Sequence, residues 1–156
     1  MNKYYFNSSA LLKYYIQETG ALWVEQIIDS ETPNIIFTSL ITMAEIASAL
    51  AVKNRATHNN ISDLECQQLL KRFVMDSRSK FTLLPVRRPI VNRAMSLSKN
   101  HRLRGYDSVQ LGTAVIMKQV LAKYTTGGEL IFVASDKDLL LAAQAEGIQT
   151  EDPMTH

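Results

Sequence analysis

Short, nearly continuous apolar runs alternate along the chain with longer segments in which apolar residues recur every three or four positions. The short runs are rich in β-branched and aromatic residues, which is typical of buried β-strands. They predict strands at residues 3–6, 34–39, 81–86, 130–135 and, from a weaker pattern, 148–151.

The longer segments have the periodicity of amphipathic helices. They predict helices at residues 8–17, 21–30, 40–54, 61–80, 89–100, 106–124 and 136–146. Gly147 directly follows the last helix and is expected to end it, because glycine often occupies this position. The sequence TTGGE, residues 125–129, is expected to form a turn before the fourth strand.

Strands that alternate with helices indicate an α/β fold around a mainly parallel sheet of four to five strands. The chain has 156 residues and contains no low-complexity linker and no internal repeat. We therefore expect a single domain over residues 1–156.

Polar side chains follow several of the predicted strands, at the edge where parallel α/β sheets bind ligands. Asn7 follows the first strand, Glu45 lies in the helix after the second, and Asp136 follows the fourth. Asp107 opens the long helix that precedes the fourth strand. Carboxylates gathered at one edge repel each other unless a cation lies among them, and such oxygen ligands suit Mg²⁺ or Mn²⁺.

Each of these residues also has a purely structural explanation. Asn7 is a favourable N-cap, and Asp107 and Asp136 could complement helix dipoles from first turns. Two patterns resemble capping boxes, the second with Asp in place of Glu or Gln: Thr42-x-x-Glu45 and Ser135-x-x-Asp138.

The net charge of +2 conceals an uneven distribution of charge. Residues 71–104 contain ten Lys or Arg against one Asp, a net charge of +9. Residues 1–70 carry −3 (four basic, seven acidic) and residues 105–156 carry −4 (three basic, seven acidic). A basic block between acidic segments favours polyanion binding, although a solvated helix surface is the alternative.

Motifs of other chemistries are absent from the sequence. It contains no GxGxxG, no GxxxxGK[ST] and no GxSxG, and its three histidines show no metal-ligand spacing. Cys66 is the only cysteine, so no internal disulfide can form, and no apolar run approaches the roughly 20 residues that span a bilayer. We expect a cytoplasmic protein that does not enter a membrane.

Four stretches, in order, are similar to motifs of the PIN-domain ribonucleases, most closely the toxin half of VapBC-type toxin–antitoxin pairs. They are YYFNSSALLKYY, SLITMAEIASAL, LRGYDSVQLGTAVI and LIFVASDKDLLLAAQAEGI, of which the last two are the most specific. The resemblance covers nearly the whole chain. It implies a three-layer α/β/α sandwich and an Mg²⁺- or Mn²⁺-dependent endoribonuclease that leaves a 5′-phosphate and a 3′-hydroxyl.

The resemblance also assigns roles to residues. The catalytic and metal-binding positions correspond to Asn7, Glu45, Asp107 and Asp136. The family has Asp at the position of Asn7, whereas the three carboxylates are expected to converge on a common point beside it. Ser9 and Ser135 match small hydroxyl positions that support the acidic cluster, and Asp138 is either an outer carboxylate or a helix cap.

Three explanations for Asn7 stay open: an engineered substitution that silences a toxic enzyme, a natural variant that works with three carboxylates, or a decayed domain. In the last case the protein would be an RNA- or protein-binding module. A phosphoacceptor receiver domain fits poorly, because the third predicted strand ends in Pro85-Val86-Arg87 rather than in Asp.

The resemblance further implies an RNA substrate, a cognate antitoxin protein and a homodimer. Apolar residues in the helices after the first and second strands exceed what one sheet face needs, which suggests a groove or a dimer face. The basic block could hold RNA or dock an acidic antitoxin segment. The candidates for RNA contact are Arg87, Arg88, Arg93, Lys99, Arg102 and Arg104.

Overall fold

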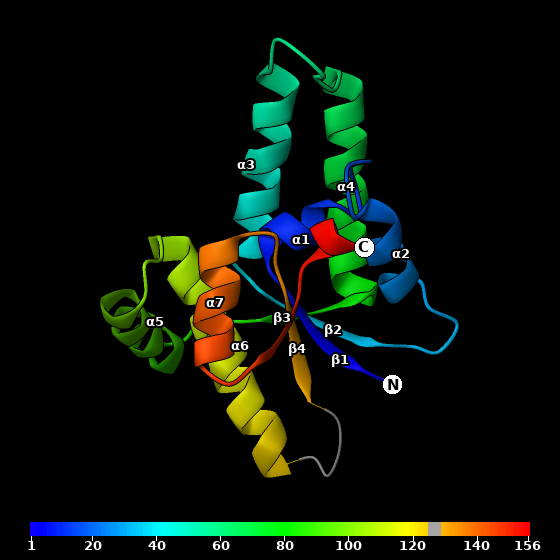
Figure 1. The fold of residues 1–156 in the computed structure, drawn as a ribbon. Helices are drawn as coiled ribbons and strands as arrows, with labels where there is room; N and C mark the ends of the chain where they lie inside the picture. The colour runs from blue at the N-terminus through cyan, green and yellow to red at the C-terminus, as the bar shows by residue number, and fades with distance from the viewer. Residues whose placement is uncertain (125–128) are drawn as a thin grey trace.

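The computed structural model describes residues 1–124 and 129–156. Within these residues, five parallel strands form one sheet in the order β3-β2-β1-β4-β5. The strands are β1 (Lys3–Phe6), β2 (Ile35–Ser39), β3 (Phe81–Leu84), β4 (Leu130–Val133) and β5 (Gln149–Glu151). The predicted α/β fold is confirmed, and the sheet is parallel throughout (Figure 1).

Helices cover both faces of the sheet (Figure 1). They are α1 (Ser8–Leu12), α2 (Ala21–Ile28), α3 (Thr42–Arg55), α4 (Asp63–Ser79), α5 (Arg88–Asn100), α6 (Gly105–Tyr124) and α7 (Lys137–Ala145), followed after β5 by a short 3₁₀ helix, η1 (Pro153–Thr155). Helices α1 to α4 contribute to the core on one face, and α5 to α7 contribute to the core on the other. Together, α3 and α4 project beyond the sheet (Figure 1).

The side chains of β1 divide between the two cores. Tyr4 and Phe6 belong to the core shared with α1 to α4, whereas Tyr5 belongs to the other. Successive side chains of a strand point to opposite faces, so a run of aromatic residues anchors β1 on both sides. The ring of Tyr5 also stacks on Phe132 of the neighbouring strand β4, with centroids 5.5 Å apart. The expected three-layer arrangement is therefore present.

The first helix ends at Leu12, well before its predicted end. The backbone N–H groups of the next three residues donate to carbonyl oxygens three positions earlier, which tightens the chain into turns. Tyr14 and Tyr15 are both buried after these turns, and their rings meet Phe81 and Phe73 edge-on. Core packing thus replaces the final turn of the predicted helix.

The remaining boundaries agree with the prediction to within two residues. Pro85 directly follows β3, and a residue without an N–H cannot extend the ladder of hydrogen bonds. Gly147 lies just beyond α7 with a φ of 71°, which confirms its predicted role at the end of this helix.

The turn expected at 125–129 lies, except for its last residue, outside the described part of the chain. None of the described helices has both the length and the hydropathy needed to cross a membrane.

Candidate functional site

The carboxyl ends of the parallel strands position the four predicted site residues. Asn7 directly follows β1, and Asp136 follows β4 as the N-cap of α7. Glu45 lies in the first turn of α3, and Asp107 lies in the first turn of α6. We call this group the acidic rim: Asn7, Glu45, Asp107 and Asp136.

Asn7 is buried and caps α1, as one of the structural explanations predicted. Its Oδ1 accepts a hydrogen bond from the backbone N–H of Ala10 at 3.0 Å and another from Ser9 Oγ at 2.9 Å. These two donors fill the two lone pairs of the amide oxygen. The other branch of the side chain is an NH₂ group, which can only donate. Asn7 therefore offers no free oxygen to a cation while it caps the helix.

A buried glutamine holds Glu45 in place. Gln110 Nε2 donates to Glu45 Oε2 at 2.5 Å, and the Oε1 of Gln110 accepts from the Tyr5 hydroxyl at 2.7 Å. Gln110 is fully buried on α6, one turn after Asp107. Gln110 was not among the predicted site residues, although a polar residue within an apolar helical face was a signal for such a contact.

Neither of the two patterns that resemble capping boxes around the rim forms one. Helix α3 has Ile41 as its N-cap, and the Thr42 hydroxyl instead lies 2.8 Å from Thr38 Oγ1 and accepts from Gln110. Asp136 rather than Ser135 caps α7 and accepts from the backbone N–H of Leu139 at 2.8 Å. Thr42 thus finds a more distant partner than the local pattern indicates, and the cap of α7 lies one residue later than the pattern placed it.

Burial and repulsion between neighbouring charges raise the pKa of two carboxyl groups of the acidic rim. Burial raises the pKa of Glu45, and the charge of Asp107 raises it further, although the side chains of Gln110 and Ser8 lower it. Burial also raises the pKa of Asp107, as does the charge of Asp136, while Arg104 lowers it. Asp107 thus interacts by charge with both of the other carboxylates, Glu45 and Asp136. An additional positive charge at this place would relieve both interactions.

The donor chemistry of the rim fits a hard divalent cation, because its free ligands are carboxylate oxygens. In addition, the buried Ser135 Oγ beside Asp136 has no hydrogen-bond partner in the described residues. Within the same residues, however, no three His, Cys, Asp or Glu side chains are grouped closely enough to form a metal site. The carboxylates interact in pairs, and their convergence on a common point stays a prediction.

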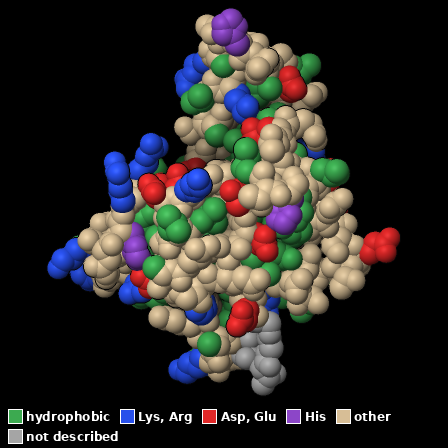
Figure 2. Space-filling view, viewed as in Figure 1, with side chains coloured by type: hydrophobic (Ala, Val, Ile, Leu, Met, Phe, Trp, Pro, Cys, Tyr) green, Lys and Arg blue, Asp and Glu red, His purple; other side chains and the backbone are tan. Residues whose placement is uncertain are grey.

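The acidic rim borders a second group of charges. A cavity of about 550 Å³ is lined by Asp107, Asp136 and Asp138 together with Arg102 and Arg104. Figure 2 shows acidic side chains with Lys and Arg side chains beside them on one face of the molecule. Part of the basic block therefore reaches the rim, and Asp138 shares this cavity with the two rim aspartates.

Other members of the basic block are used within the fold. Arg93 of α5 forms an ion pair with Glu146, whose carboxylate also lies 3.0 Å from His101 Nε2. The guanidinium of Arg72 lies over the rings of Tyr14 and Tyr15. The other five candidates for RNA contact are exposed and form no ion pair among the described residues: Arg87, Arg88, Lys99, Arg102 and Arg104.

Solved structures with a similar fold include the following three. A toxin–antitoxin complex from Klebsiella pneumoniae contains a chain with a TM-score of 0.55 and 21% identity, covering 86% of this chain and 88% of that one. A chain of FitAB bound to a DNA fragment has a TM-score of 0.62 and 12% identity, with coverages of 97% and 95%. A chain of VapBC2 from Rickettsia felis, bound to promoter DNA, has a TM-score of 0.61 and 11% identity, with coverages of 96% and 98%.

The sequence comparisons define the family. No curated protein matches the sequence. The family model of the PIN domain matches residues 4–143, a span that includes every residue of the acidic rim. The match extends over far more than half of the chain, and the structural neighbours agree with it in fold. The protein therefore belongs to the PIN domain family.

Proposed function

We propose that this protein is a metal-dependent endoribonuclease, the toxin of a toxin–antitoxin pair, whose activity Asn7 weakens. The observation that carries the proposal is the coupled charge of Glu45, Asp107 and Asp136 at the carboxyl edge of a PIN-type sheet. The biological role is supported by the structural neighbours, among which is a chain of a toxin–antitoxin complex.

In this proposal Glu45, Asp107 and Asp136 hold Mg²⁺ or Mn²⁺, with Asn7 beside them. When bound, the ion supplies an acidified water and offsets charge on the phosphate of the RNA. Gln110 keeps the Glu45 carboxylate in one orientation through a hydrogen bond that is itself fixed by Tyr5. Arg102 and Arg104, at the edge of the same rim, attract the RNA backbone by charge.

The hydrogen bonds of Asn7 explain how this residue weakens the site. Its oxygen is used by Ala10 and Ser9, so only the NH₂ group remains. In Asn7→Asp one oxygen would keep the cap and the second would be free to bind a cation. Asp is as good an N-cap as Asn, so we expect stability to change by about 1 kcal/mol or less.

The test is cleavage of structured RNA with Mg²⁺ or Mn²⁺ by the native chain and by Asn7→Asp. We expect the substitution to raise the rate by about tenfold or more, a barrier change of at least about 1.4 kcal/mol. EDTA should abolish the cleavage, and so should adding Asp107→Asn to Asn7→Asp.

The two other outcomes are equally informative. Equal cleavage by both proteins would show that three carboxylates suffice and that Asn7 is not inhibitory. No cleavage by either protein across several RNAs would contradict the proposal and favour a module that only binds RNA or protein.

A further inference from the structure

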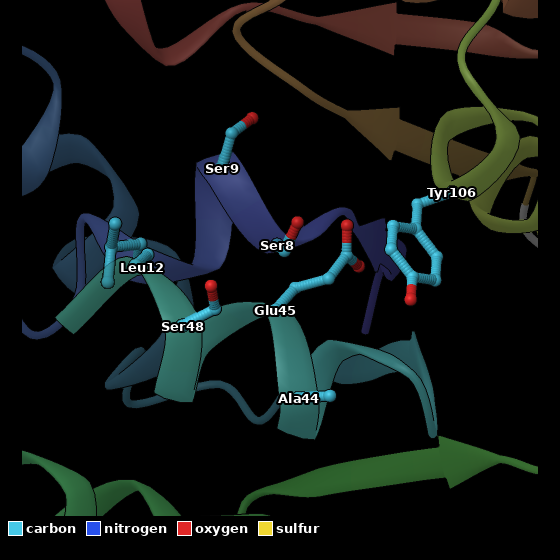
Figure 3. A pocket seen from close by; sticks show the side chains of 8 residues that line it. Ser8, Ser9, Leu12, Ala44, Glu45, Ser48 and Tyr106 are labelled. Carbon is cyan, nitrogen blue, oxygen red and sulfur yellow. The ribbon is translucent and has the colours of Figure 1, made fainter. Parts of the chain in front are cut away.

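A second cavity, of about 580 Å³, adjoins the acidic rim between α1, α3 and α6. Its lining combines the Glu45 carboxylate, the hydroxyl groups of Ser8 and Ser48, the apolar side chain of Leu12 and the ring of Tyr106. Figure 3 shows the Glu45 carboxylate between Ser8 and Tyr106. The cavity therefore places a flat aromatic face and several hydroxyl groups next to a proposed metal ligand.

The ring of Tyr106 contributes little to the fold. The side chain is 66% exposed, and within the described residues it stacks on no other ring and its hydroxyl makes no hydrogen bond. Tyr106 nevertheless directly precedes Asp107 in the first turn of α6, so its position is set by the element that positions the rim. An exposed aromatic ring fixed beside a charged site is suited to contact a ligand rather than the core.

We propose that the Tyr106 ring stacks on a nucleobase of the bound RNA and that this cavity receives the base. The inference rests on the proposed function, because RNA brings a base next to every phosphate. Single-stranded RNA is commonly bound through bases stacked on aromatic side chains. A base stacked on Tyr106 is attached, through its ribose, to a phosphate close to Asp107.

The remaining lining suits the two surfaces of a base. Leu12 and Ala49 offer apolar contact to its faces. The hydroxyl group of Ser48 can donate or accept, and that of Ser8, whose proton is directed at Glu45, can accept, so together they can pair with the polar edge of a base. Stacking alone tolerates every base, and any preference among bases therefore comes from these hydroxyl groups.

The first experiment measures binding without cleavage. The four ribonucleoside 5′-monophosphates contain no phosphodiester bond, and ribose 5-phosphate serves as a matched probe without a base. Each probe is titrated into the protein in the presence of Mg²⁺. Calorimetry measures the affinity, and NMR detects ring-current shifts of the base protons. We expect Tyr106→Ala to weaken binding of at least one nucleotide by about tenfold or more. Tyr106→Phe should retain that binding, because it keeps the ring.

The matched control is Tyr124→Ala. Tyr124 lies at the opposite end of α6 and is 71% exposed, so this variant removes the same side chain from the same helix. It should bind nucleotides as the native chain does. Equal affinity of Tyr106→Ala and the native chain, or equal binding of nucleotides and ribose 5-phosphate, would overturn the inference and leave the cavity to a protein segment.

A second readout separates this inference from the proposed function. In the Asn7→Asp background, Tyr106→Ala should raise the KM for RNA cleavage by about tenfold or more. Base-dependent nucleotide binding without any RNA cleavage would refute only the ribonuclease proposal. RNA cleavage with an unchanged KM in Tyr106→Ala would refute only the role of the ring.

Discussion

Two amide side chains determine which atoms of the acidic rim are available. Asn7 uses its only acceptor to bind Ala10 and Ser9, and it therefore stabilises α1 without offering a ligand. Gln110 does the reverse, because it is buried and uses its donor to orient Glu45 toward the rim. At this scale the proposed weakening of the site comes down to the number of oxygen atoms that are free to bind a cation.

Asp107 should destabilise the metal-free protein at neutral pH. Its pKa is raised in the folded chain, so between its ordinary and raised values the folded state binds more protons than the unfolded state. Stability is thus greatest below this window and falls as the pH rises through it. We expect Asp107→Asn to raise the unfolding temperature in EDTA at about pH 7, by roughly 2–4 °C for each kcal/mol of relieved repulsion.

Thermal unfolding followed by circular dichroism checks this prediction. The gain should shrink as the pH is lowered, because the native carboxyl group then becomes protonated. Glu25→Gln provides a control, since Glu25 is an exposed carboxylate on α2 away from the rim. A pH-independent effect of Asp107→Asn would contradict electrostatic strain at this residue.

At the scale of elements, the candidates for RNA contact in and around α5 are of two kinds: one is paired within the fold, and the others are exposed. Arg93 links α5 to the end of α7 through its ion pair with Glu146. The exposed candidates lie toward the two ends of α5, with Arg87 and Arg88 at its start and Arg104 beyond its end. Because Arg93 is already paired with Glu146, we expect the exposed candidates rather than Arg93 to provide most of the attraction for an RNA backbone.

RNA binding should therefore depend on salt through the exposed arginines. Replacing Arg87, Arg88 and Arg104 together by Gln is expected to flatten the slope of log K against log salt by about 0.7 for each phosphate that is no longer neutralised. Fluorescence anisotropy with a single-stranded RNA over a range of salt concentrations measures the slope.

Two further variants calibrate this measurement. Lys123→Gln removes a charge at the far end of α6 and should leave the slope unchanged. Arg93→Gln should lower stability rather than the slope, because it breaks the ion pair with Glu146. An unchanged slope in the triple variant would assign the exposed charge to solvation or to a protein partner.

The predictability of these elements has a physical basis. Burial imposes a period on the sequence, and the apolar runs therefore revealed every strand and nearly every helix boundary. Side-chain partners follow no such period. Thr42 and Glu45 fit the pattern of a capping box, yet Thr42 pairs with Gln110, 68 positions away. The Asp136 cap was one residue from the expected place, because Asp and Ser compete for the same N-terminal turn. The contacts that orient the rim are thus tertiary, and only the fold reveals them.

At the scale of the molecule, the projecting pair of α3 and α4 carries exposed apolar side chains. Val52, Leu64 and Met75 are each more than half exposed there. Exposed apolar side chains on a projecting element suit a contact with another protein. The predicted antitoxin and homodimer contacts both require such a surface, and we propose that α3 and α4 provide it.

Val52→Glu should therefore weaken self-association or capture of a co-expressed antitoxin without unfolding the chain. A charge placed at the centre of an apolar contact is expected to reduce affinity by about tenfold or more, since unpaired buried charges are costly. Analytical ultracentrifugation and co-purification from the native host measure the two effects.

The control for this prediction is Leu141→Glu. Leu141 is 61% exposed on α7, away from the projecting pair, and its replacement should change neither measurement. A native chain that sediments as a 17.6 kDa monomer and purifies from its host without a small partner would contradict the proposed interface.

The order of strands in the sheet has a consequence for folding during synthesis on the ribosome. The first strand of the sheet in chain order, β1, lies between β2 and β4, and Phe6 is in register with Val133 of β4, the fourth strand. Contacts so distant in sequence form late and slowly, since the intervening chain must first be made and its ends brought together. The nascent polypeptide can therefore assemble α1 to α4 while Asp136 is still missing. The acidic rim is completed only after β4 and Asp136 have been made, so the proposed metal site cannot form while only α1 to α4 have been synthesised.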